Sequence, residues 1–331
     1  MTPARLTRAL TFRDLVVYGL LFIGPLAPVG VFGVLDARTS GAVALVYLAA
    51  TLAMAFTAWS YAEMSRVVPH AGSVFAYASE GLGRTTGFMA GWLAMLDYLL
   101  IPSVAYLFSG IALHALVPSV PAWVFTLIAF AATTALNLAG VVIAARAGFV
   151  VLVAEIGVLA LFTVCALAVL ASHGPARPWD SALTGLGPFA WSPVVGAVSI
   201  AVLSFLGFDA IAGFAEENAG DPKDVGRAIL LCLTVAGVTF VAQTWLAALL
   251  AVTSPGELAA RPERQGTAFY DITRAAIAPW LASVVASTKA VGPAFAACCS
   301  EWLATVACRR SWPAWTRAMA CLAWRWRRLP A

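Results

Sequence analysis

The sequence predicts an all-α polytopic membrane protein, and its composition and its apolar runs carry that prediction. The chain has 331 residues, of which 62% are hydrophobic and only 11% charged, with a mean hydropathy of +0.89. These values are far too apolar for a soluble domain. Apolar runs of about 20 residues recur along the chain, and this is the length that a helix needs to cross a bilayer.

These runs predict a transmembrane domain over residues 1–297 and a separate segment, of different composition, over residues 298–331. Within the domain we expect eight spans, at about 14–35, 42–61, 86–107, 122–143, 149–171, 194–215, 228–252 and 275–297.

The basic residues predict how the chain is inserted. Arg5, Arg8 and Arg13 precede the first span, and cations at this position favour a cytoplasmic N-terminus. The first apolar run is a full span without a clear small-residue cleavage site, so we expect no cleavable signal peptide. The expected location is therefore the inner or plasma membrane, with the lipid bilayer as a partner of a multi-pass chain.

Several function classes find no support in the sequence. The net charge of +4 comes from basic residues that lie mostly in short loops, where they set topology, so we expect no nucleic-acid partner. The six cysteines form no CxxC pair and the three histidines are widely separated, so we expect neither metal nor cofactor. No nucleophile, metal cluster or paired catalytic carboxylates gather near one interface, which argues against an enzyme. No filter motif or pore-lining polar stripe supports a channel.

The first and sixth spans carry residues that interrupt helices. The stretch IGPLAPVGVFG (residues 23–33) packs five glycines and prolines into eleven residues, and each proline removes a backbone donor and clashes with the preceding turn. The sixth span holds Gly207 and Asp209 in its second half, where a break over residues 204–207 would expose backbone groups. The alternatives are a plain proline kink in the first span and a kinked, continuous helix in the sixth.

The two interruptions lie five spans apart, and this spacing has a functional meaning. Interruptions at corresponding positions of two halves indicate an inverted-repeat transporter that holds its substrate near the middle of the membrane.

Two long motifs resemble a known family. The segment AEMSRVVPHAGSVFAYASEGLGRTTGFMAGW (residues 62–92) and the segment GFDAIAGFAEENAGDPKDVGRAIL (residues 207–230) are similar to signatures of the amino acid, polyamine and organocation (APC) permeases. The resemblance covers roughly residues 10–255. It implies a five-plus-five inverted-repeat (LeuT-like) transporter fold, here with an incomplete second repeat. The proline-rich GPLAPVG departs from the common Gly-Ser-Gly-Ile-Phe type of loop and is similar to versions found among amine and amino acid importers.

By position, the resemblance implies that the exposed backbone of the first and sixth spans binds the amino and carboxylate groups of the substrate. The implied substrate-binding residues are Ile23, Gly24, Pro25, Ala27, Pro28, Val29, Gly30, Ser204, Phe205, Gly207 and Phe208.

Three carboxylates lie within the expected spans, at Asp97, Glu155 and Asp209, and the first seven spans hold no lysine or arginine to neutralise them. A buried carboxyl group can exchange a proton near physiological pH. We expect Glu155 to be the proton carrier, because the fifth span packs beside the first in the resembling fold. For Asp97 a structural role and cation binding stay open. Asp209 is also a possible cation ligand, although we expect it to cap the second half of the sixth span.

The function that we predict is secondary active transport by alternating access. The substrate would be an amino acid or a polyamine or related amine, imported with protons, and sodium stays open as the coupling ion. The alternatives are an inactive truncated permease fragment and a non-transporting membrane protein on the same scaffold.

The composition changes abruptly at Cys298. Residues 298–331 hold four of the six cysteines and five of the twelve tryptophans. A basic, aromatic helix at the membrane surface is one interpretation. The other is a truncated or frameshifted permease. Codons for residues 298–309 read from their third bases permit LLGMARDGRLP, which resembles the Met-Ala-Arg-Asp-Gly segment after the eighth span of this family. We expect the reading frame to slip before Cys298, and resequencing the gene tests this.

Overall fold

The structure is a computed structural model that describes residues 10–292, apart from residues 69–72, 140, 216 and 222. Within these residues the regular elements are helices. Their bounds are α1 Phe12–Ile23, η1 Ala27–Gly30, α2 Phe32–Arg38, α3 Val43–Val67, α4 Ser73–Leu82, α5 Arg84–Leu116, α6 Ala122–Ala139, α7 Val141–His173, α8 Ser181–Thr184, α9 Trp191–Ala201, η2 Val202–Phe205, α10 Ala210–Gly213, α11 Lys223–Leu250, α12 Pro255–Ala260, η3 Pro262–Arg264 and α13 Ala268–Ala276. A last helix covers residues 279–292.

Six helical segments of the described chain are long and apolar enough to cross a membrane. They are Phe12–Gly30, Val43–Val67, Arg84–Leu116, Ala147–His173, Trp191–Gly213 and Lys223–Leu250. They correspond to the first, second, third, fifth, sixth and seventh expected spans, which confirms an all-α protein with several apolar spans.

Several expected spans differ from the structure in their bounds. Helices α3 and α5 run to Val67 and Leu116, beyond the expected ends at 61 and 107. Helix α6 ends at Ala139 rather than near residue 143. The expected span 275–297 is divided, because α13 ends at Ala276 and the next helix begins at residue 279, while residues 293–297 and the expected tail 298–331 lie outside the described residues. A proline at position 279 explains the division, since proline has no backbone N–H to donate within a helix but fits the first turn of one.

The first span begins at a residue with the right chemistry for a helix start. The Thr11 side chain accepts a hydrogen bond from the Asp14 amide, and the Asp14 carboxylate accepts one from the Thr11 amide, which together make a capping box. Helix α1 ends at Ile23, and Gly24 follows it as the C-cap residue, with a left-handed φ of +71°. The sequence therefore fixes both ends of α1 locally.

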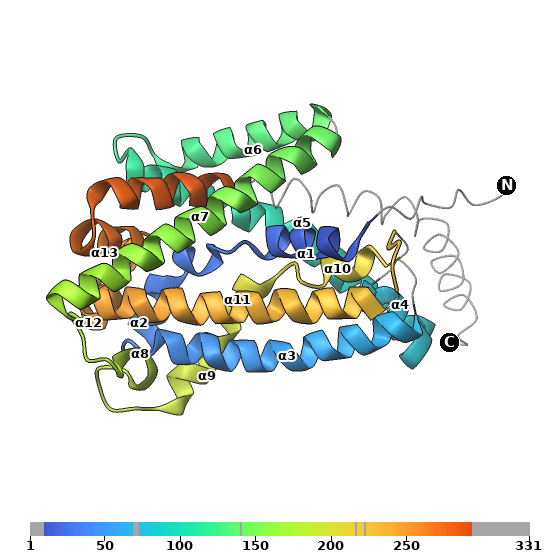
Figure 1. The fold of residues 1–331 in the computed structure, drawn as a ribbon, viewed down its shortest axis with the longest axis horizontal. Helices are drawn as coiled ribbons and strands as arrows, with labels where there is room; N and C mark the ends of the chain where they lie inside the picture. The colour runs from blue at the N-terminus through green and yellow to red at the C-terminus, as the bar shows by residue number, and fades with distance from the viewer. Residues whose placement is uncertain (1–9, 69–72, 140, 216, 222, 293–331) are drawn as a thin grey trace, which may run out of the picture.

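The bundle is organised around two long helices and two interrupted spans. Helices α3 and α11 pack side by side along most of their lengths (Figure 1). Helix α1 packs against α10, and α2 packs against α9, so the first and sixth spans run in opposite directions. Figure 1 shows α4 and α10 at one end of the bundle, and α2, α8 and α12 at the other. This antiparallel pair places both interruptions in the middle of the molecule.

Aromatic rings fill the core beside the interruptions. The rings of Tyr47, Phe205 and Phe240 contact one another with centroids 4.9–6.5 Å apart, and these three residues come from α3, η2 and α11. All three side chains are fully buried. Their packing joins the sixth span to the two long helices.

Candidate functional site

The break in the first span lies between α1 and η1. Gly24 and Pro25 separate the two helical pieces, and the amide of Leu26 donates no hydrogen bond within the described residues. Pro25 has no amide hydrogen, and its carbonyl oxygen accepts a hydrogen bond from the Gln243 side chain at 3.0 Å. The predicted interruption is thus present, and α11 supports it.

The break in the sixth span follows η2. The chain leaves the helix at Leu206, whose ψ is 140°, and turns through Gly207, whose φ is +101°. The amide of Phe208 donates no hydrogen bond within the part of the chain that the structure describes. A second helical piece, α10, then begins at Ala210. The continuous kinked helix, the alternative for this span, is therefore wrong.

The sixth-span break touches the end of α1, next to the first-span break. A Cβ built on Gly207 would lie 2.8 Å from the Phe22 Cβ and 3.0 Å from the Phe22 carbonyl carbon and oxygen. Only a residue without a side chain allows this approach. Nearby, the hydroxyls of Tyr47 and Ser204 share a hydrogen bond of 2.8 Å, which fixes η2 against α3.

Replacing Gly207 by alanine is expected to destabilise the fold. A left-handed φ costs a residue with a Cβ about 1–2 kcal/mol, and the contact with the Phe22 backbone adds to this. Thermal unfolding in detergent measures the loss. The control is Gly196→Ala in α9, where a Cβ meets nothing within 4 Å and helix propensity favours alanine. Equal midpoints for the two variants would contradict this prediction.

The expected substrate-binding residues gather around these breaks, and most of them are buried. Gly30 lies against Phe108 of α5, since a Cβ built on it would lie 2.9 Å from that ring. Phe208 packs edge-on against Tyr61, with ring centroids 5.7 Å apart. The side chains of Ile23, Val29, Phe205 and Phe208 all belong to the hydrophobic core. Backbone groups at these positions are therefore better placed for binding than these side chains.

Two of the three carboxylates lie together beside the sixth-span break. Asp97 of α5 interacts electrostatically with Asp209, and the Tyr98 hydroxyl donates to the Asp209 carboxylate at 3.1 Å. Asp209 occupies the N-cap position of α10, but its side chain makes no capping hydrogen bond. The backbone N–H groups of Gly207 and Ala210 nevertheless lie beside the carboxylate, so a stabilising role at the start of α10 stays a prediction, with the Tyr98 hydroxyl as a further partner. Tyr98 bonds Asp209 rather than its neighbour Asp97.

Glu155, the third carboxylate, faces the break in the first span. Its Oε2 lies 3.8 Å from a Cβ built on Gly24, and its side chain is 3% exposed. Helix α7 thus packs beside α1, as expected. On its other side, the carboxylate occupies the space over Gly292, where a Cβ would overlap its Oε1.

Lys289 lies near Glu155, and the sequence predicts no role for it. Its side chain is 5% exposed, it interacts electrostatically with Glu155, and its ammonium lies 5.9 Å from the Phe108 ring centroid. A buried charge needs a partner of opposite sign. The signal in the sequence was a lysine within an apolar run, but nothing in the sequence paired it with Glu155.

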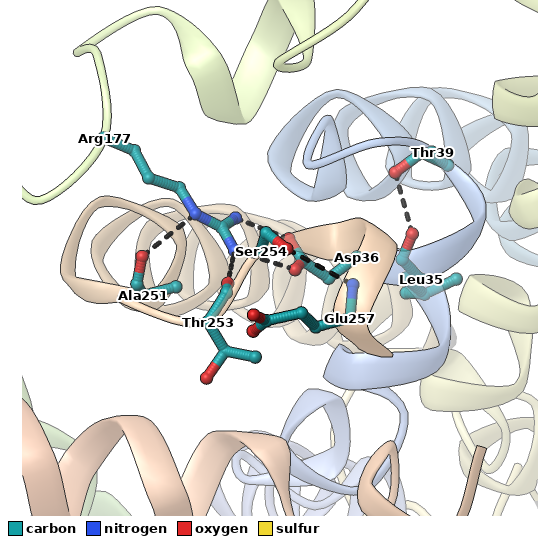
Figure 2. A network of polar contacts seen from close by, with 8 residues as sticks. All are labelled: Leu35, Asp36, Thr39, Arg177, Ala251, Thr253, Ser254 and Glu257. Atoms are coloured by element: carbon teal, nitrogen blue, oxygen red, sulfur yellow. Dashed lines mark hydrogen bonds and ion pairs between the residues drawn. The ribbon is translucent and has the colours of Figure 1, made fainter. Parts of the chain in front are cut away.

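An ion pair at the end of the bundle that holds α2 and α12 was also missed. Figure 2 shows the Arg177 guanidinium directed at Asp36. Its Nη1 donates to Asp36 Oδ1 at 2.8 Å, and its Nη2 donates to Oδ2 at 3.0 Å. Arg177 also donates to the carbonyl oxygens of Ala251 and Thr253. The side chains of Arg177 and Asp36 are 5% and 0% exposed. This cluster ties the end of α2 to the loop after α7 and to the end of α11.

Comparison with known proteins adds to this geometry. The family model described as amino acid permease matches residues 14–300. The chain belongs to the amino acid permease family. This confirms the resemblance to APC permeases that the two motifs indicated.

Individual relatives agree with the family match. The chain is 33% identical over 247 residues to a low-affinity putrescine importer of Escherichia coli (strain K12), covering 72% of this chain and 53% of that protein. It is 29% identical over 262 residues to a branched-chain amino acid permease of Lactococcus lactis, covering 72% and 55%. It is 30% identical over 220 residues to a γ-aminobutyric acid permease of E. coli, covering 64% and 45%. The chain spans about half the length of these relatives.

Proposed function

We propose that this chain acts as a secondary active transporter that imports amino acids or related amines by alternating access, and not as an enzyme. The observation that carries the proposal is the close approach of the sixth-span break, at Gly207, to Phe22 at the end of α1, next to the first-span break, in a permease-family chain. Interrupted spans of this kind hold free backbone groups where a substrate can reach them. The expected binding residues at Ile23 to Gly30 and at Ser204 to Phe208 would supply these groups.

The charges around the breaks favour a substrate with a protonated amine. Asp97 and Asp209 place two carboxylates beside the sixth-span break. An ammonium group there would offset their mutual repulsion, which is the cation-binding role left open above. Helix N-termini attract anions, but the Asp209 carboxylate already lies beside the backbone N–H groups of Gly207 and Ala210. A substrate carboxylate would therefore bind at the first-span break, where the Leu26 amide is free.

Coupling to protons is the second part of the proposal. Glu155 is a buried carboxyl beside Gly24, so a change in its charge acts directly on the break in the first span. The location that we propose is the inner or plasma membrane, with a cytoplasmic N-terminus set by Arg5, Arg8 and Arg13.

Uptake by the full chain in proteoliposomes tests the proposal. The probes are radiolabelled putrescine, leucine and γ-aminobutyrate, the substrates that the relatives' names indicate. We expect uptake of at least one probe to rise when the outside is made acidic, with no response to a sodium gradient. Sodium-driven uptake would instead assign the coupling to sodium. Absence of uptake of all three probes would support the alternative of an inactive permease fragment.

A further inference from the structure

Gln243 carries a buried polar atom that has no hydrogen-bond partner among the described residues. It lies on α11 with a side-chain exposure of 1%. Four buried side-chain oxygen atoms of the described residues have no hydrogen-bond partner, and the Gln243 Oε1 is one of them. The other three belong to Ser73 and Tyr77 of α4 and to Ser181 of α8. Among these atoms, Oε1 belongs to the side chain that contacts the first-span break.

The orientation of this amide follows from chemistry. The group that faces the Pro25 carbonyl oxygen must be a donor, because a carbonyl oxygen only accepts. The Gln243 Nε2 therefore faces Pro25, and the two ends of the amide cannot exchange without placing two oxygens against each other. Consequently Oε1 is the atom left without a partner.

No donor of the described residues reaches Oε1. One turn earlier on α11, Phe240 packs its ring against Tyr47 and Phe205, so this part of the interface is aromatic. The Tyr47 hydroxyl is hydrogen-bonded to Ser204. In native proteins an unsatisfied buried acceptor calls for an explanation, and a bound ligand is one.

We propose that the Gln243 Oε1 accepts a hydrogen bond from the primary ammonium of the transported molecule, and that Gln243 thereby selects substrates that carry N–H donors. This inference rests on the proposed function. The same side chain holds the Pro25 carbonyl through Nε2, so Gln243 links substrate binding to the geometry of the first-span break. An ammonium is suited to this acceptor because hydrogen bonds from charged donors are stronger than neutral ones. In a diamine one ammonium would contact Oε1 and the other would lie beside the Asp97 and Asp209 carboxylates, whereas the single ammonium of an amino acid can occupy only one of these two places.

Binding measurements on the full chain in detergent test the role. Calorimetric titration gives the Kd of putrescine and leucine, and of the analogues of each in which methyl groups replace all ammonium hydrogens. We expect Gln243→Leu to weaken binding of at least one unmethylated probe about tenfold, the effect of one charge-assisted hydrogen bond. The methylated analogues should lose less affinity than the unmethylated probes, because they have no donor for Oε1 and report only the loss of the contact with Pro25. Thr244→Val is the matched control, since that buried hydroxyl bonds only to carbonyl oxygens of its own helix.

Each outcome of this experiment has a distinct meaning. If Gln243→Leu weakens the unmethylated probe and its methylated analogue equally, Gln243 acts only through Pro25, and the proposed contact is wrong. If it weakens neither, Oε1 holds a water molecule or nothing, and the proposal is again wrong. If the wild type binds none of the probes, the proposed function itself fails and this inference fails with it.

Discussion

Arg177→Met is expected to lower the free energy of unfolding by about 3–5 kcal/mol. This range is the usual cost of removing one partner of a buried ion pair, because the other charge is left without compensation. Here the remaining charge is Asp36, whose side chain is 0% exposed and accepts both guanidinium hydrogen bonds of the pair. Methionine keeps most of the volume of the arginine stem, so lost packing contributes little.

The same variant loosens more than one segment. Arg177 also donates to the carbonyl oxygens of Ala251 and Thr253, so its loss removes two of the contacts between the loop after α7 and the end of α11, while the hydrogen bond from the Ala176 amide to the Leu249 carbonyl oxygen remains. Thermal unfolding of purified protein in detergent measures the effect. The control is Arg38→Met, because Arg38 lies on the same end of α2 but is exposed.

A double variant separates the charge from the architecture. Asp36→Leu combined with Arg177→Met removes both charges, and such apolar replacements of buried pairs are often neutral. We expect the double variant to regain most of the stability that Arg177→Met loses. A double variant as unstable as the single one would show that the backbone contacts of Arg177, and not its charge, hold this end together.

The helix breaks were predictable because their causes are local. Glycine tolerates a positive φ and proline removes a backbone donor, so Gly24, Pro25 and Gly207 reveal the interruptions in their own sequence neighbourhoods. The predicted ends of the fourth and eighth spans differ from the helix ends in the structure, since hydropathy alone does not mark where a helix stops. Asp209 shows the same limit. Its position predicted an interaction with the start of α10, but the hydrogen bond from Tyr98, which lies on another helix, could not be predicted.

The partners of buried polar groups could not be predicted, because the fold alone brings them together. Asp36 and Arg177 are 141 positions apart in the chain, and Gln243 is 218 positions from Pro25. Nothing in the sequence around Asp36, Arg177 or Gln243 indicates its partner. Lys289 was visible as a lysine in an apolar run, yet only the packing of the last helix places it near Glu155.

Glu155→Gln is expected to abolish the response of uptake to a pH gradient, with at least a tenfold loss of proton-driven uptake. Glutamine has the size of glutamate but cannot exchange a proton, and proton transfer by a positioned carboxyl is the role that we propose for this residue. The position of Glu155 supports an effect on transport, because its carboxylate lies between Gly24 at the first-span break and Gly292 of the last helix.

Uptake measured across a series of external pH values checks this prediction, together with substrate binding at one pH. Binding should change less than threefold, because Glu155 faces α1 and the last helix while the Asp97 and Asp209 carboxylates lie beside the other break. The matched control is Glu63→Gln, since Glu63 is exposed at the end of α3 and pairs with Arg66 at 3.1 Å. Surface pairs of this kind contribute little. An unchanged pH profile in Glu155→Gln would mean that another group carries the proton. In that case Lys289, the buried cation beside Glu155, becomes the next residue to replace.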